Sequence, residues 1–170
     1  MNKDDLRALQ APLKDRYKEA PSEAQTTLTA RGTLDLEQLA CRIPAGRGET
    51  IEAGLHPLAG GDGSWACSGD LLLESLAACA GVTLCAVATA TGASVTGGEV
   101  IAEGDLDLRG TLGVSRDADV GFSRIRLLFR LNTTADDAQL KKLAELTERY
   151  CVVAQSLRTP ISLEIARTSA

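Results

Sequence analysis

Histidine and aromatic side chains are nearly absent from this chain of 170 residues, which has one histidine, one tryptophan and an aromatic content of 3%. With His56 as the only imidazole, the chain offers little for a Cys–His nucleophile pair. A zinc site would need at least three of the five cysteines from scattered segments, because no two of them have Cys-x-x-Cys spacing. These absences argue against a resident metal and against a histidine-activated thiol.

Positive charge is also scarce, since 18 Lys and Arg stand against 23 Asp and Glu and give a net charge of −5. That balance argues against nucleic acid or an anionic membrane as a partner. Residues 1–5 contain no apolar signal region, so we expect a cytoplasmic protein. An odd number of cysteines in a reducing compartment argues against a framework of structural disulfides.

The longest apolar stretch spans residues 68–91, where Glu74 is the only charged residue after Asp70. Its Leu and Ala content and its lack of proline predict a helix. Ser68 is expected to cap this helix, Asp70 suits its first turn and Gly92 should end it.

A helix that is apolar nearly all round is either a membrane span or the centre of a protein core. Small residues dominate this one, and neither end carries Lys or Arg. Both features are untypical of a membrane span, so we interpret it as a buried central helix.

The other segments predict an α+β fold in one domain, residues 1–170, with a helical extension at 1–24. The expected elements are a helix at 4–18 that Pro12 bends or restarts, a hairpin of strands 26–33 and 34–43 that turns near Arg31, a strand at 49–54, two long antiparallel strands at 95–108 and 122–131, a helix from Thr134 to Leu157, and a strand at 161–165.

Two cysteines are candidate catalytic residues. Cys79 lies midway along the apolar helix, and Cys151 follows Glu-Arg-Tyr in the second long helix. A reactive thiol needs a positive neighbour, and Arg149 lies two residues before Cys151. The residues alone leave open the alternative that both thiols are inert core side chains.

Two segments resemble motifs of the OsmC/Ohr family, the osmotically inducible and organic-hydroperoxide-resistance proteins. They are Asp-Leu-Leu-Leu-Glu-Ser-Leu-Ala-Ala-Cys (70–79), with Gly-Val-Thr-Leu after it, and Glu-Arg-Tyr-Cys-Val-Val-Ala-Gln-Ser-Leu (148–157). The order of the predicted elements is also similar, over about residues 25–166. The resemblance implies an intertwined homodimer in which two long central helices are wrapped by antiparallel sheets.

The resemblance also implies thiol peroxidase chemistry in oxidative stress defence. By position, Cys79 would be the peroxidatic cysteine, which an organic hydroperoxide oxidises to a sulfenic acid, and Cys151 the resolving cysteine, which forms a disulfide with it. An external dithiol would reduce that disulfide, and no cofactor or metal is needed. Apolar walls expected near Cys79, namely Trp65, Leu72, Leu76 and Val82, would favour small organic hydroperoxides.

Peroxidase members of the family use an Arg from the early strands and a Glu ten residues before the first cysteine. Gly69 stands at that Glu position, so Asp70 is the candidate acid, although its place also fits a purely structural role at the helix start. Arg31 is the preferred arginine, with Arg42 and Arg47 as competitors. The alternative function is a non-catalytic stress protein that binds an apolar ligand in the dimer pocket.

Overall fold

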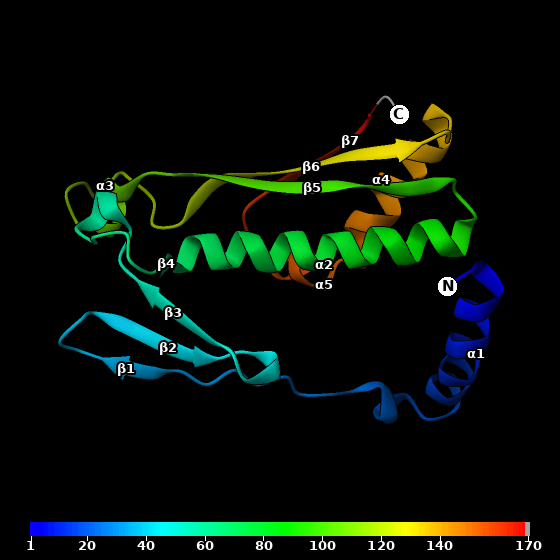
Figure 1. Cartoon of the computed structure of the whole chain (residues 1–170), viewed down its shortest axis with the longest axis horizontal. Helices are drawn as coiled ribbons and strands as arrows, with labels where there is room; N and C mark the ends of the chain where they lie inside the picture. The colour runs from blue at the N-terminus through cyan, green and yellow to red at the C-terminus, as the bar shows by residue number, and fades with distance from the viewer. Residues whose placement is uncertain (169–170) are drawn as a thin grey trace.

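The computed structural model describes residues 1–168 and has two sheets around one long helix (Figure 1). The helices are α1 (Lys3–Glu19), α2 (Ser68–Thr91), α3 (Leu108–Thr111), α4 (Asp137–Tyr150) and α5 (Val152–Ser156), with 3-10 turns at Pro21–Ala24, Gly46–Gly48 and Pro57–Ala59. The strands are β1 (Thr33–Asp35), β2 (Ala40–Pro44), β3 (Thr50–Gly54), β4 (Ala66–Cys67), β5 (Val95–Leu106), β6 (Phe122–Thr133) and β7 (Ile161–Arg167).

The predicted central helix is confirmed as α2, and it lies along one face of the β5–β6–β7 sheet (Figure 1). Gly92 ends it in the left-handed conformation, with φ of 73°, as expected for a glycine after a helix. The capping prediction was wrong: the N-cap is Cys67, which makes no side-chain capping bond, and Ser68 is already helical.

The core forms where α2 packs against the inward face of β6. Alternate residues of β6 point to the helix, and the fully buried residues of this cluster are Leu76, Ala80, Leu84, Ile125, Leu127, Phe129, Leu131 and Cys151. A smaller cluster joins the end of α2 to α4 through Val87, Ala88, Ala135, Leu140 and Leu143. The outward face of β6 is wet, as predicted: Arg126 pairs with Glu103 and Asp105 of β5, and Arg130 pairs with Glu99.

The four-stranded sheet, β1-β2-β3-β4, lies on the other side of α2 from the three-stranded sheet (Figure 1). Only Ala40 and Ala53 of its residues are buried. The predicted hairpin turn near Arg31 was wrong, because the chain turns between β1 and β2, over residues 36–39. Asp35 accepts the Gln38 amide there, at 3.1 Å, and Leu39 has a φ of 52°.

The second long helix is shorter and broken, which corrects the prediction for residues 134–157. Asp136, rather than Thr134, caps α4 through a reciprocal pair of bonds with Gln139, because β6 continues to Thr133. The helix stops at Cys151, whose ψ of 106° is extended, and α5 restarts at once.

The remaining predicted helices and strands are present with small changes in their bounds. The helix at 4–18 is confirmed as α1, and it continues through Pro12 without restarting. Strand 49–54 is β3, and the long strands are β5 and β6, which pair antiparallel. The last strand is β7, which is parallel to β6. The assignment of residues 1–170 to a single domain stays a prediction.

Candidate active site: a pair of thiols at the α2–α5 junction

Cys79 lies midway along α2, on the side that faces the core. Its i+1 and i−3 neighbours Ala80 and Leu76 are fully buried, while Cys79 itself is partly buried at the edge of the main cluster. The helix position follows from the apolar periodicity of the sequence. The helix fixes the position of the Cys79 backbone, and the side chain remains partly exposed.

Cys151 occupies the break between α4 and α5 and is 1% exposed. It is the C-cap of α4 and the N-cap of α5, and its Sγ accepts the backbone amide of Ala154 at 3.5 Å. The break turns the first amides of α5 toward the sulfur atoms. Backbone N–H groups at a helix start favour negative charge, so this corner suits an ionised sulfur.

The fold brings Cys79 and Cys151 into one core cluster, where each thiol is among the groups that shift the pKa of the other. Burial raises the pKa of the Cys79 thiol, but the amides of Val153 and Val152, the Cys151 thiol and the Thr83 hydroxyl outweigh it and hold that pKa below its ordinary value. Burial raises the pKa of the Cys151 thiol, and the neighbouring Cys79 adds to the rise despite the Ala154 amide. Cys79 is therefore the thiol that ionises first.

The two other predicted site residues are not beside the thiols within one chain. Arg31 lies in an exposed segment just before β1, and no guanidinium is among the groups that shift the pKa of Cys79. Arg42 is engaged by Asp35 and Glu52 in the four-stranded sheet. The pKa of Cys79 is thus lowered by uncharged donors.

Asp70 is exposed in the first turn of α2, nine residues before Cys79. Nine residues correspond to about 13 Å along a helix and to its opposite side. Asp70 therefore cannot reach the sulfur of Cys79 from its own helix. Its carboxylate lies at the positive end of the helix, where a negative charge is stabilising. A catalytic role for Asp70 stays a prediction.

An apolar cavity of about 430 Å³ lies at the start of α2 and adjoins the core around the thiols. Leu72 contributes to it from the same helix side as Cys79, since seven residues make almost two full turns. Phe122, Ile125 and Leu157 line this cavity and also belong to the cluster that contains both cysteines. The cavity is open to a small apolar molecule.

Of the four walls predicted near Cys79, only Leu72 lines this cavity. Leu76 is fully buried in the core, Val82 is 72% exposed, and Trp65 packs over Gly54 beside a different hollow. The sequence did not predict Leu157 as a cavity wall or the amides of 152–154 as donors to the thiols. Neither the approach of α5 to the start of α2 nor the break before α5 has a local sequence signal.

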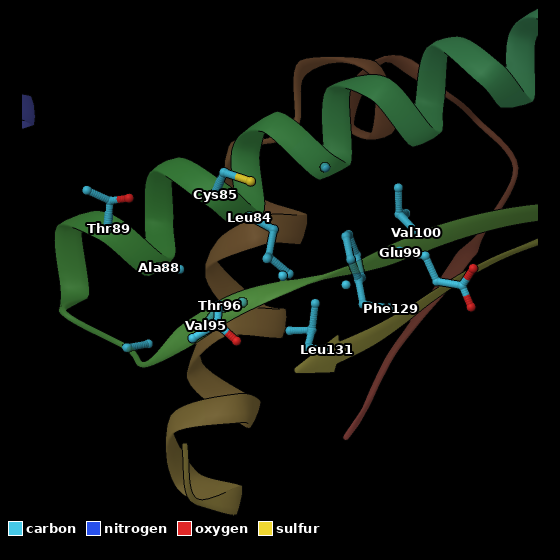
Figure 2. Close-up of a pocket in the computed structure, with 14 residues that line it drawn as sticks. Leu84, Cys85, Ala88, Thr89, Val95, Thr96, Glu99, Val100, Phe129 and Leu131 are labelled. Atoms are coloured by element: carbon cyan, nitrogen blue, oxygen red, sulfur yellow. The ribbon is translucent and has the colours of Figure 1, made fainter. Parts of the chain in front are cut away.

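A second cavity, of about 370 Å³, lies farther along α2, between this helix and β5 (Figure 2). Leu84, Ala88, Val95, Phe129 and Leu131 form its apolar wall. Cys85 stands at its rim as an exposed thiol, and neither Cys79 nor Cys151 lines this cavity or the one at the start of α2. The two cavities thus lie along different stretches of α2.

The arrangement can carry out thiol–disulfide chemistry without a metal. Within residues 1–168, no three His, Cys, Asp or Glu side chains gather so that they could hold an ion. The same part of the chain contains no disulfide, and all five cysteines are free thiols. A nucleophilic sulfur beside a protonated one is the pair that oxidation to a sulfenic acid and then to a disulfide requires.

Comparison with known proteins identifies the class. The family model of OsmC-like proteins matches residues 61–166, and the chain therefore belongs to this stress-related family, as the sequence resemblance predicted. The match covers the stretch from the loop before α2 to the end of β7. A search of curated protein sequences finds no match.

Solved structures share the fold at low sequence identity. The OsmC-like protein of Mycoplasma pneumoniae has a TM-score of 0.71 at 14% identity over 85% of this chain and 99% of its own. An organic hydroperoxide resistance protein of Elizabethkingia anophelis gives 0.66 at 15% identity, over 86% and 99%. The organic hydroperoxide resistance protein OsmC of Legionella pneumophila gives 0.64 at 14%, over 85% and 100%.

The fold also decides between the two interpretations of α2, a membrane span or a central helix. By length and composition alone this helix could cross a membrane, with a mean hydropathy of 2.0 over its most apolar stretch. In this fold it is instead the central helix between the two sheets (Figure 1). The α+β prediction is confirmed.

Proposed function

We propose that this chain is a thiol-dependent peroxidase that reduces organic hydroperoxides in oxidative stress defence. The observation that carries the proposal is the packing of Cys79 against the core cluster that contains Cys151, with the pKa values of the two thiols shifted in opposite directions. Cys79 is then the peroxidatic residue and Cys151 the resolving one. The names of the structural neighbours from Elizabethkingia and Legionella support this choice of substrate.

The chemistry balances with these two residues and an external dithiol. The Cys79 thiolate attacks the outer oxygen of ROOH, an S–O bond forms as the O–O bond breaks, and the departing alkoxide takes a proton from solvent to become ROH. Cys79 is now a sulfenic acid, oxidised by two electrons. Cys151 attacks its sulfur, and hydroxide leaves with the thiol proton as water. Two exchanges with the dithiol restore both thiols.

Substrate preference follows from the apolar cavity at the start of α2. Leu72, Phe122 and Leu157 offer apolar surface to an alkyl or aryl group, and each buried CH₂ contributes about 0.8 kcal/mol. Hydrogen peroxide has no such group. Organic hydroperoxides should therefore react faster than hydrogen peroxide.

The active form in this proposal is a cytoplasmic homodimer. In the single chain, only 28% of the apolar stretch of α2 is buried, and Val82 is 72% exposed on it. An apolar helix face of this size requires cover. In this proposal a second copy supplies the cover, and it is also the source from which an Arg31 guanidinium would approach Cys79.

The direct test is a coupled assay with tert-butyl hydroperoxide, cumene hydroperoxide and hydrogen peroxide, with a dithiol as reductant. Cys79→Ser should abolish turnover, and Cys151→Ser should reduce one peroxide molecule per chain and then stop. Cys85→Ser is the matched control, because Cys85 is an exposed thiol of the same helix, and it should keep activity. No turnover by folded protein with any of the three peroxides would refute the proposal.

A second candidate function is binding of an apolar ligand by a non-catalytic stress protein. The cavity in Figure 2 favours it, because it offers an apolar wall that includes neither Cys79 nor Cys151. In that case, a Cys79→Ser and Cys151→Ser double variant should bind an apolar fluorophore as the parent does, while Leu84→Gln weakens binding. Peroxide consumption would be absent in all of them.

A further inference from the structure

Thr83 lies one helical turn after Cys79, on the same side of α2. Its Oγ1 donates to the Cys79 carbonyl oxygen at 2.8 Å, in a partly buried position. Four residues along a helix also put this hydroxyl on the side of α2 that carries the Cys79 side chain, and the hydroxyl helps to lower the pKa of Cys79. The hydroxyl carries a single proton and gives it to the carbonyl in this structure, so a bond to the sulfur would replace the bond to the carbonyl.

The bond to the carbonyl is the dispensable one of the two. In an α-helix the carbonyl of Cys79 already accepts the backbone amide of Thr83, so the hydroxyl adds a second, unneeded donor. A bond to an ionised acceptor is about twice as strong as one between neutral groups. The hydroxyl should therefore turn from the carbonyl to the sulfur when the thiol loses its proton.

Few other groups compete for this role. Of the groups that shift the pKa of Cys79, only Cys151 titrates, and the rest are the amides of Val152 and Val153 and this hydroxyl. The inward face of β6, against which this part of α2 packs, is apolar. Glu74 and Arg149 are both exposed. The hydroxyl is thus the one side-chain donor besides Cys151 among the groups that shift this pKa.

We propose that Thr83 is the thiolate-stabilising residue of the site, which donates its hydroxyl proton to the ionised Cys79 sulfur and holds it toward Cys151. This proposal rests on the peroxidase function for its biological meaning, and its physical basis is the position of the Thr83 hydroxyl one turn from Cys79. It gives the site a neutral donor where a charged neighbour would otherwise activate the thiol.

The chain supplies a matched control in Thr91. Its Oγ1 also donates to the carbonyl four residues earlier, that of Val87, at 2.8 Å and in a partly buried position, but no thiol lies there. Thr91→Val therefore removes the same helix bond without touching Cys79. Any difference between Thr83→Val and Thr91→Val reports on the sulfur.

The experiment measures the alkylation rate of Cys79 by iodoacetamide from pH 5 to 10, with mass spectrometry of its peptide. Thr83→Val should raise the apparent pKa of Cys79 by about one unit and slow alkylation at neutral pH by up to about tenfold. Thr83→Ser should restore the parental profile, and Thr91→Val should leave it unchanged. Thr83→Ala replaces Thr83→Val if the valine variant does not fold.

Equal profiles for Thr83→Val and Thr91→Val would overturn the proposal, since the hydroxyl would then serve the helix alone. Alkylation needs no peroxide, so this result is independent of the peroxidase assay. If alkylation shifts as expected and no variant consumes hydroperoxide, Thr83 tunes the thiol but the proposed function fails. If both hold, Thr83→Val should also lower kcat/KM, and Thr83→Ser should recover it.

Discussion

Cys79, on α2, packs against the core cluster that contains Cys151, at the break between α4 and α5, and the two thiols shift each other's pKa: Cys151 lowers that of Cys79, and Cys79 raises that of Cys151. The pair is asymmetric because the environments differ. Cys79 is partly buried and faces amides and a hydroxyl, whereas Cys151 is 1% exposed. Of the two thiols, Cys79 is thus expected to ionise at the lower pH.

The first prediction concerns pH. Because the pKa of Cys79 is lowered in the folded chain, its thiolate should appear at a lower pH than the ordinary value near 8.5 for a free cysteine. The rate of Cys79 alkylation should rise with pH and level off before that of the same peptide in denaturant. Cys151, whose pKa is raised, should react later. A folded midpoint for Cys79 at or above the denatured one would contradict this ordering.

The same shift has a consequence for stability. A folded pKa below the unfolded one means that the contribution of Cys79 is present above the unfolded pKa and is lost as the pH falls through the folded pKa. Cys79→Ser should remove this dependence. The check is a comparison of urea unfolding of the two proteins across pH 6 to 9 under reducing conditions.

The second prediction separates the roles of the two cysteines. After organic hydroperoxide, Cys151→Ser should carry a sulfenic acid on Cys79, which dimedone traps, and excess peroxide should oxidise it further. Cys79→Ser should leave Cys151 as a thiol, because no sulfenic acid forms for it to attack. A sulfenic acid on Cys151 in Cys79→Ser would reverse the assignment.

The third prediction concerns Asp70, which is exposed and on the side of α2 away from Cys79. We expect it to favour the helix start electrostatically, so Asp70→Asn should lower the free energy of unfolding by at most about 1 kcal/mol. Turnover should largely survive. A hundredfold loss of turnover in a folded Asp70→Asn protein would show that a carboxylate at this position takes part in catalysis.

The fourth prediction concerns assembly. Val82 is 72% exposed on the apolar side of α2, and Val114 is equally exposed in the loop between β5 and β6. If a second copy covers α2, Val82→Lys should weaken the dimer by about tenfold or more, because it buries an unpaired charge. Val114→Lys should have no effect. Sedimentation at micromolar concentration decides, and a folded parental monomer there would refute the dimer.

Local patterns were enough for the long elements. The apolar run of α2 with Gly92 after it, and the alternation along β5 and β6, have strong local causes in residue type and periodicity. The early hairpin was misplaced because Leu36 and Leu39 are three residues apart, which breaks the alternation where the chain in fact turns.

The site itself depends on contacts that no local pattern carries. The resemblance to OsmC/Ohr motifs pointed to Cys79 and Cys151, but residues 148–157 look helical throughout, so the break at Cys151 could not be expected. That break is what aims the amides of Val152 and Val153 at a sulfur from another helix. Tertiary packing, not propensity, thus sets the chemistry of the thiol pair.

The most direct measurement is disulfide mapping by mass spectrometry after one equivalent of cumene hydroperoxide, in the absence of reductant. The account predicts a single disulfide, between the peptides that carry Cys79 and Cys151, with Cys41, Cys67 and Cys85 still reduced and full reversal by a dithiol. If Cys79 and Cys151 both stay reduced while the protein remains folded, the peroxidase account is contradicted and the apolar-ligand function takes its place.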